Sequence, residues 1–208
     1  MGTLSGRRFP TARIVDVRLI LASTSPRRRE LLSRLGVAFD VTAPRYDEVI
    51  DPRVSPEGQA AAFALGKARS VASFDAVVLG SDTLVVVDRT ILGKPADPAD
   101  ARRMLSLLRG RAHRVITAVA VITPGQPDHV FVDVAVVRMR AIGDEELAEY
   151  VATGEPLDKA GAYAAQGIGA RFIESIEGDQ TTVIGLPLKR VAESLRQRGI
   201  PTPADVSL

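Results

Sequence analysis

The chain has 208 residues, 46% of them hydrophobic and 25% charged, which is ordinary for a globular protein that can bury a large core. A formal net charge of +2 and an aromatic content of 4% disfavour nucleic-acid binding by bulk electrostatics or base stacking. The chain has no cysteine, and no apolar run approaches the roughly 18 residues of a membrane span. We therefore expect a cytoplasmic protein that binds neither nucleic acid nor a membrane.

The first residues differ from the rest of the chain. Residues 1–16 contain glycine, serine, proline and arginine without an apolar period, and they lack the apolar core of a secretory signal. We predict a flexible N-terminal tail over residues 1–16, dispensable for folding, and a single domain over residues 17–208.

An anion site is predicted near the start of this domain. A strand over Val17–Ala22 is followed by a hydroxyl-rich turn and by Ser25 and Pro26, which are typical of a helix start. Arginines fill the first turn of this helix, although the helix dipole there favours anions over cations. The combination suits phosphate, and the alternative is a solvated basic helix face.

The segment Val77–Val87 is the one around which we expect the fold to be organised. Its β-branched residues predict a strand that is buried on both faces and interrupted at Gly80. Asp82 lies in its middle and needs a cation, a metal or a water-filled cleft, because carboxylates are almost never buried unpaired. Alternatively, Asp82 caps a turn between two strands. Lys94 follows in a loop, between a glycine and a proline.

The remaining segments predict alternating strands and helices. Strands are expected over 39–42, 113–122 and 129–139, helices over 56–73, 98–109, 143–151 and 186–198, and a hairpin from strands 171–176 and 180–184. Lys67 lies on the second helix, where a surface position is the usual case. His113 and His129 have no companion ligand nearby, which favours structural or surface roles. Residues 154–167 combine glycines with acids, a lysine, a tyrosine and a glutamine, as in a segment that closely approaches a ligand.

Five ordered blocks resemble the Maf family of nucleoside triphosphate pyrophosphatases. They are Ser23-x-Ser25-Pro26-Arg27-Arg28-x-Glu30-Leu31-Leu32, Gly80-x-Asp82-Thr83, Lys94-Pro95, Glu155-Pro156-x-Asp158-Lys159-Ala160-Gly161-x-Tyr163-x-x-Gln166-Gly167 and Gly185-Leu186-Pro187. The resemblance covers about residues 19–195. It implies an α/β fold with a mixed twisted sheet, flanking helices and two lobes around a central cleft, similar to inosine-triphosphate pyrophosphatase. It also implies a divalent metal, Mg²⁺ or Mn²⁺, and often a homodimer.

The family's site residues transfer onto this chain by position. The resemblance implies Asp82 as the catalytic acid and as a metal ligand, with Glu48 as the most natural second ligand in a short acidic stretch. The implied substrate-binding residues are Ser23, Arg27, Arg28, Lys67, Thr83, Lys94, Asp158, Lys159 and Gln166, and Asp158 is a further candidate metal ligand.

Three of these positions mark a branch of the family. Arg27, Thr83 and Gln166 match the pattern of the dTTP/UTP pyrophosphatases, which favours thymidine and uridine nucleotides over methylated guanine nucleotides. Cytidine and modified pyrimidine nucleotides stay open as substrates. A side-chain amide can pair with the N3–H of uracil or thymine and a neighbouring carbonyl. The alternative is that Gln166 ties down the backbone near Gly167.

The implied reaction is attack of water on the α-phosphorus, which yields nucleoside monophosphate and pyrophosphate. A carboxylate among cations is a weak base, so we expect Asp82 to orient a water whose pKa a bound metal lowers. The rival function is a non-hydrolytic nucleotide-binding regulator of cell division or septum formation. Asp82 disfavours it, because a pure binder gains nothing from a carboxylate that faces phosphates.

Overall fold

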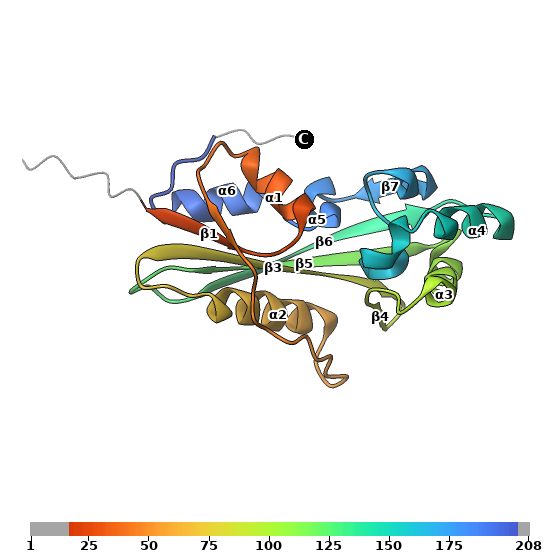
Figure 1. The fold of residues 1–208 in the computed structure, drawn as a ribbon, viewed down its shortest axis with the longest axis horizontal. Coiled ribbons are helices and arrows are strands. Elements are labelled where there is room, and N and C mark those ends of the chain that lie inside the picture. Colours follow the sequence, from red (N-terminus) through yellow and green to blue (C-terminus); the bar gives the residue numbers. More distant parts are fainter. Residues whose placement is uncertain (1–16, 204–208) are drawn as a thin grey trace, which may run out of the picture.

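A seven-stranded mixed sheet is the frame of the molecule (Figure 1). The computed structural model describes residues 17–203, so the tail predicted over 1–16 lies outside the described residues. The strands are β1 Arg18–Ala22, β2 Asp40–Thr42, β3 Ala76–Val87, β4 Thr90–Leu92, β5 Ala112–Ile122, β6 His129–Met139 and β7 Ile173–Glu177. Their order is β2-β1-β3-β5-β6-β7, with β4 also paired to β3. Only the β1–β2 and β1–β3 pairs are parallel among the described strands, so the expected mixed sheet is confirmed.

Six α-helices accompany the sheet within residues 17–203. They are α1 Pro26–Ser33, α2 Pro56–Ser70, α3 Pro98–Leu108, α4 Asp144–Ala152, α5 Gln180–Ile184 and α6 Leu188–Arg196. The first three begin with proline after a capping residue. The side chains of Ser25, Ser55 and Asp97 accept a backbone N–H from the first turn, which confirms the predicted helix starts.

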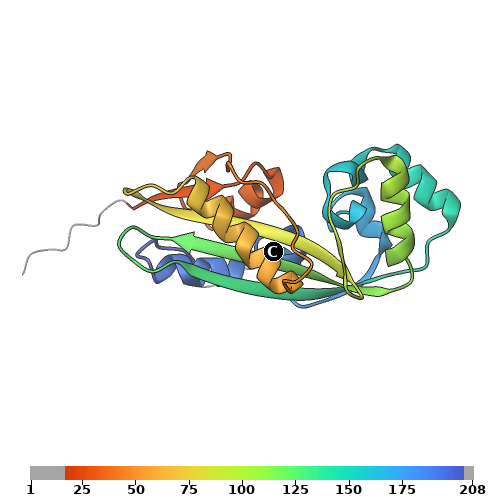
Figure 2. The same cartoon turned by 90° about the horizontal axis from the view of Figure 1, so that it is seen from below.

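The helices divide the molecule into two lobes (Figures 1 and 2). In the first lobe, α2 covers one face of the sheet, and α1, α5 and α6 cover the other. The second lobe contains α3, α4 and residues 155–172, which pack around the far ends of β3, β5 and β6. Tyr150 and Phe172 are fully buried at its centre.

Strand β3 passes through both lobes and confirms the prediction of burial on both faces. Val77 and Leu79 pack in the core shared with α1 and α6, whereas Val78 packs against α2. The expected interruption at Gly80 is wrong, because β3 is continuous over 12 residues. A Cβ on Gly80 would lie 2.5 Å from the carbonyl oxygen of Ala64. The glycine therefore lets α2 approach the strand closely.

The hairpin predicted near the C-terminus is half wrong. β7 forms as a strand, but residues 180–184 form the short helix α5. The side chain of Asp179 accepts the N–H of Thr181 at 2.8 Å, and Gly185 ends the helix with φ of +120°. These two caps outweigh the strand preference of the β-branched residues between them.

His113 is a buried structural residue, as its isolation in the sequence favoured. Its side chain lies in β5 with a relative exposure of 3%, and its Nε2 is 2.7 Å from the hydroxyl of Tyr163. Burial lowers the pKa of His113 from 6.5 to about 4. The imidazole is therefore neutral in the folded protein near pH 7.

No helix within residues 17–203 is long and apolar enough to cross a membrane.

Replacing Gly80 with alanine is predicted to destabilise the first lobe. The new methyl group would meet backbone atoms of Ala64 and Ala68 at 2.5 and 2.8 Å, so α2 must shift. Overpacking of this kind costs about 1–3 kcal/mol. Urea unfolding should show that loss for Gly80→Ala but not for Gly93→Ala, where a Cβ meets nothing within 4 Å. Equal stabilities of the two variants would contradict the close packing of α2.

Protonation of His113 is predicted to make the fold sensitive to acid. The folded pKa is depressed, so the unfolded chain binds a proton between pH 6.5 and 4 that the folded chain does not bind. Stability should therefore fall as the pH decreases through this window, by ~2 kcal/mol between pH 7.5 and pH 5. Unfolding free energies of wild type and His113→Gln at both pH values test this. Between pH 7.5 and pH 5, the unfolding free energy of His113→Gln should fall by ~2 kcal/mol less than that of wild type. Equal decreases in the two proteins would show that His113 is not responsible.

Candidate active site

The candidate site lies where one edge of β3 has no neighbouring strand among residues 17–203. β1 pairs with β3 only as far as Gly80, and β4 pairs with β3 only over Val85 to Val87. Residues 81–84 are therefore free of a strand on this edge, while β5 pairs with the other edge. A cleft of about 550 Å³ opens at this gap, a volume typical of small-molecule sites.

The structure brings all eleven predicted site residues to this one cleft, although they come from six segments of the chain. They are Ser23, Arg27, Arg28, Glu48, Lys67, Asp82, Thr83, Lys94, Asp158, Lys159 and Gln166. Both lobes contribute, since the last three residues belong to the second lobe.

Asp82 and Lys67 form the buried centre of the cleft. Lys67 Nζ lies 2.6 Å from Asp82 Oδ1 and 2.6 Å from Glu48 Oε1. Asp82 and Lys67 are only 4% and 8% exposed, so Lys67 is not an ordinary surface lysine. Asp82 lies within β3, which rules out the alternative of a turn cap. The cation required by a buried carboxylate is therefore supplied by α2.

The second oxygen of Asp82 bears on the expected metal. Asp82 Oδ2 is buried and has no hydrogen-bond partner among the described residues. Within residues 17–203, no group of three or more His, Cys, Asp or Glu side chains could hold a metal ion. Mg²⁺, however, is usually bound by one or two carboxylates together with substrate phosphates. Asp82 and Glu48, which share Lys67, fit that pattern.

Arg28 crosses from the helix start to the sheet. Its Nε donates to the carbonyl of Gly185 at 3.0 Å, and its Nη2 donates to Thr83 Oγ1 at 3.0 Å. Burial lowers the pKa of Arg28, an effect opposed by the carboxylates of Asp82 and Glu48, and the guanidinium stays charged. A solvated basic face thus describes the exposed neighbour Arg29 but not Arg28.

Two further groups in the cleft suit an anion. Ser23 is buried in the turn after β1, where its hydroxyl accepts the N–H of Ser25 at 3.1 Å. Lys94 is exposed in the loop after β4, and no ion pair or hydrogen bond engages its ammonium within residues 17–203. Its charge is therefore available to a ligand.

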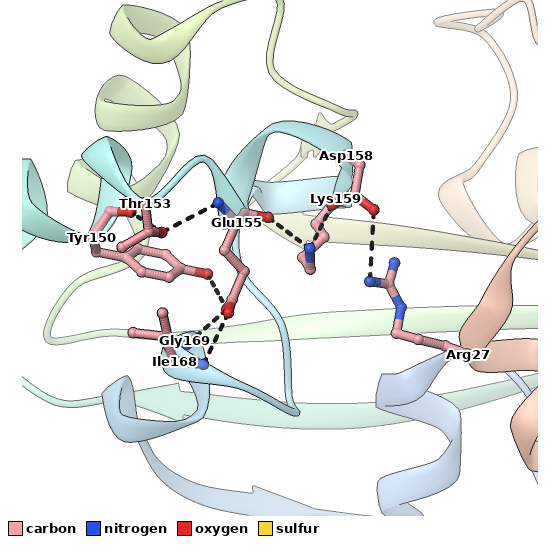
Figure 3. Close-up of polar contacts among 8 residues, drawn as sticks. All are labelled: Arg27, Tyr150, Thr153, Glu155, Asp158, Lys159, Ile168 and Gly169. Carbon is pink, nitrogen blue, oxygen red and sulfur yellow. Dashed lines mark hydrogen bonds and ion pairs between the residues drawn. The ribbon is translucent and has the colours of Figure 1, made fainter.

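Arg27 and Asp158 face each other between the lobes (Figure 3). Arg27 Nη1 lies 4.0 Å from Asp158 Oδ2, and Lys159 also bonds to Asp158. Burial alone would raise the pKa of Asp158, but Lys159 and Arg27 together lower it, so the carboxylate is ionised. Lys159 Nζ additionally donates to the carbonyl of Glu155 at 2.6 Å.

Gln166 reaches the cleft from the same segment of the second lobe. Its side chain makes no hydrogen bond within residues 17–203, so it does not tie down the backbone at Gly167. Glu155 has that role instead, because its carboxylate accepts the N–H groups of Ile168 and Gly169 at 3.0 and 2.9 Å. The alternative structural role considered for Gln166 therefore belongs to Glu155.

Tyr46 also lines the cleft, and sequence reasoning missed it. A Cβ on Gly66 would lie 2.2 Å from Cε2 of Tyr46, so the ring packs directly on α2 one residue before Lys67. This contact holds the segment that carries Glu48. The available signal was a glycine inside a helix, where it costs stability unless another group approaches closely.

Known proteins resemble this chain over most of its length. The family model "Maf-like protein" matches residues 18–198. The chain is 50% identical to a dTTP/UTP pyrophosphatase of Moorella thermoacetica over 88% of this chain and 96% of the relative. It is 49% identical to another of that name from an Anaeromyxobacter species, over 90% and 93% of the two chains.

Solved structures offer a more distant similarity. A nucleoside-triphosphatase described as a dITP/XTP pyrophosphatase from Mycobacterium abscessus aligns at a TM-score of 0.43 with 18% identity, covering 88% of this chain and 95% of that one. A HAM1 protein from Coxiella burnetii aligns at 0.46 with 13% identity, covering 76% and 80%. On the match of the family model and the identity of the curated relatives, the chain belongs to the Maf family.

Proposed function

We propose that this protein hydrolyses nucleoside triphosphates at the α-phosphorus to nucleoside monophosphate and pyrophosphate, with dTTP and UTP as preferred substrates. The observation that carries the proposal is a buried, ionisable Asp82 that faces a cleft rich in arginine and lysine. The names of relatives 46–50% identical to the chain support it. A cytoplasmic location and a homodimer belong to this proposal.

The cations of the cleft hold the triphosphate. A triphosphate carries about four negative charges near pH 7, and charge-assisted hydrogen bonds from arginine and lysine match its oxygens. Arg27 and Arg28 stand at the N-terminus of α1, where backbone N–H groups add to the positive potential. Lys94 approaches from the opposite end of the gap in the sheet edge. The substrate is thereby held along β3 with its phosphates near Asp82.

Asp82 orients the attacking water and takes up its proton. The water oxygen bonds to the α-phosphorus while the bond from phosphorus to the α–β bridging oxygen breaks, and pyrophosphate leaves with that oxygen. Oδ2 of Asp82 is the acceptor, because Oδ1 is engaged by Lys67. Lys67 holds the carboxylate in one orientation, and its positive charge offsets the negative charge of the carboxylate.

A divalent metal completes the site in this proposal. Asp82 and Glu48 would hold Mg²⁺ or Mn²⁺ together with phosphate oxygens of the substrate. When bound, the ion neutralises phosphate charge and makes the water more acidic. Tyr46 contributes indirectly, because its contact with Gly66 keeps Glu48 beside Lys67.

A non-hydrolytic regulator has no comparable support. Such a protein requires a phosphate grip but no carboxylate at the phosphates, and Asp82 is buried there at the cost of a dedicated lysine.

Replacing Asp82 with asparagine is predicted to abolish hydrolysis but retain binding. The amide keeps the shape, but it accepts no proton and binds metal poorly, so pyrophosphate release should fall by at least about 100-fold. Release from dTTP is measured with Mg²⁺, with Mn²⁺ and with a chelator, which should stop the wild-type enzyme. Asp128→Asn removes a carboxylate that pairs with Arg69 outside the cleft and serves as the control. Wild-type turnover in Asp82→Asn would refute the catalytic assignment.

Replacing Gln166 with glutamate is predicted to weaken base selection. A carboxylate can accept the N3–H of uracil but cannot donate to its carbonyl, so the preference for UTP and dTTP over CTP and GTP should shrink by about 10–200-fold. The measurement is kcat/KM for the four nucleotides. Gln126→Glu, in the exposed turn between β5 and β6, is the matched control. A uniform loss across all four substrates would show that Gln166 does not select the base.

A further inference from the structure

Glu155 is a polar centre beside the cleft that the proposed chemistry does not use. It does not line the cleft, yet its carboxylate collects three donors (Figure 3). Tyr150 Oη donates to Oε1 at 3.0 Å, the N–H of Gly169 to Oε1 at 2.9 Å, and the N–H of Ile168 to Oε2 at 3.0 Å. A single side chain thus holds two successive peptide groups just after Gln166.

Two glycines of this segment lie so close to the carboxylate and its tyrosine partner that neither position has room for a side chain. Gly167 has φ of +88°, and a Cβ there would lie 2.8 Å from Oε2 of Glu155. A Cβ on Gly169 would lie 2.5 Å from the hydroxyl of Tyr150. A larger residue at Gly167 would push the carboxylate away from the backbone, and one at Gly169 would displace the hydroxyl that donates to it. The backbone after Gln166 is therefore fitted closely to Glu155.

The ionisation states favour the same arrangement. Burial alone would raise the pKa of Glu155, but the N–H groups of Gly169 and Ile168 and the hydroxyl of Tyr150 lower it. Burial, followed by the adjacent carboxylate, raises the pKa of Tyr150, so its hydroxyl stays a donor at neutral pH. The carboxylate accepts and its three partners donate throughout the neutral range.

We infer that Glu155 is a positioning residue for base selection, which fixes the backbone on which Gln166 is carried into the cleft. The inference rests on the proposed function of Gln166. Gln166 makes no hydrogen bond of its own within residues 17–203, so the direction of its amide depends on the backbone that carries it. A loosened backbone would let the amide meet uracil and cytosine alike, since each base can be matched by turning the amide.

The test replaces Glu155 with glutamine, which has the same shape but only one acceptor oxygen for three donors. Dissociation constants for UTP and CTP are measured with a chelator present, so that no turnover is needed. The preference for UTP should fall by at least about threefold in Glu155→Gln. Glu149→Gln is the matched control, because Glu149 is exposed on α4 in the same lobe and its side chain makes no ion pair or hydrogen bond within residues 17–203.

A double variant separates positioning from a general structural effect. In a Gln166→Ala background, Glu155→Gln should cause no further loss of preference, because the side chain it positions is absent. Equal weakening of UTP and CTP by Glu155→Gln, or an additive loss in the double variant, would overturn the inference. So would a wild-type protein without preference.

Tyr150→Phe provides a milder variant if Glu155→Gln does not fold. It removes one donor and keeps the buried ring, so the preference should fall partway in the same direction. An unchanged preference in Tyr150→Phe would then overturn the inference. Pyrophosphate release with Mg²⁺ is assayed on the same proteins. Absence of release by wild type would reject the proposed hydrolysis, while the binding ratios still decide the role of Glu155.

Discussion

The buried contact between Lys67 and Asp82 is the interaction on which the site depends. A carboxylate inside a strand that is buried on both faces is unstable without a cation, and losing one partner of such a pair costs about 3–5 kcal/mol. Lys67 can reach Asp82 only because Gly80 allows α2 to lie against β3. The pairing is also incomplete, since Oδ2 has no partner among the described residues. The fold thus stabilises the carboxylate enough to bury it and leaves one oxygen available for chemistry.

The gap in the sheet edge turns this buried pair into an accessible site. β1 ends opposite Gly80 and β4 pairs with β3 only over Val85 to Val87, so on this edge the intervening part of β3 borders the cleft rather than another described strand. On its other edge, β3 is paired to β5 from Val78 to Val86, which keeps this part of the strand fixed. The carboxylate that we propose as catalytic therefore stands on a rigid element, and any movement that ligand entry requires falls on the loops around it.

Local signals in the sequence predicted most of the fold, but they could not predict the contacts between distant segments. Serine-proline and aspartate-proline pairs correctly predicted the starts of α1, α2 and α3, because capping is decided within one turn. The β-branched residues of Gln180–Ile184 wrongly predicted a strand, because the caps at Asp179 and Gly185 favour a helix there. The family motif named residues that the structure places in one cleft, but the burial of Lys67 follows only from the docking of α2. The sequence did not predict the contacts of Glu155, because its partners include backbone N–H groups, which no side-chain pattern reveals.

In the proposed function, the two lobes divide the recognition of a nucleotide, and this division explains why Glu155 stands so near an anion site. The phosphate-binding residues proposed in the first lobe stand on or beside its sheet and helices, whereas Gln166 is carried by 3₁₀ turns and glycines of the second lobe. Such a segment has few ladder hydrogen bonds and needs a tether of its own. An amide at Glu155 would offer one acceptor oxygen, while a carboxylate offers two and can serve three donors. Those donors stabilise the negative charge of the Glu155 carboxylate, and Lys159 donates to the backbone carbonyl of the same residue. Both effects weaken the repulsion between this carboxylate and the phosphates of a bound nucleotide. The carboxylate of Glu155 therefore binds the backbone without cancelling the positive potential of the cleft, which a triphosphate requires.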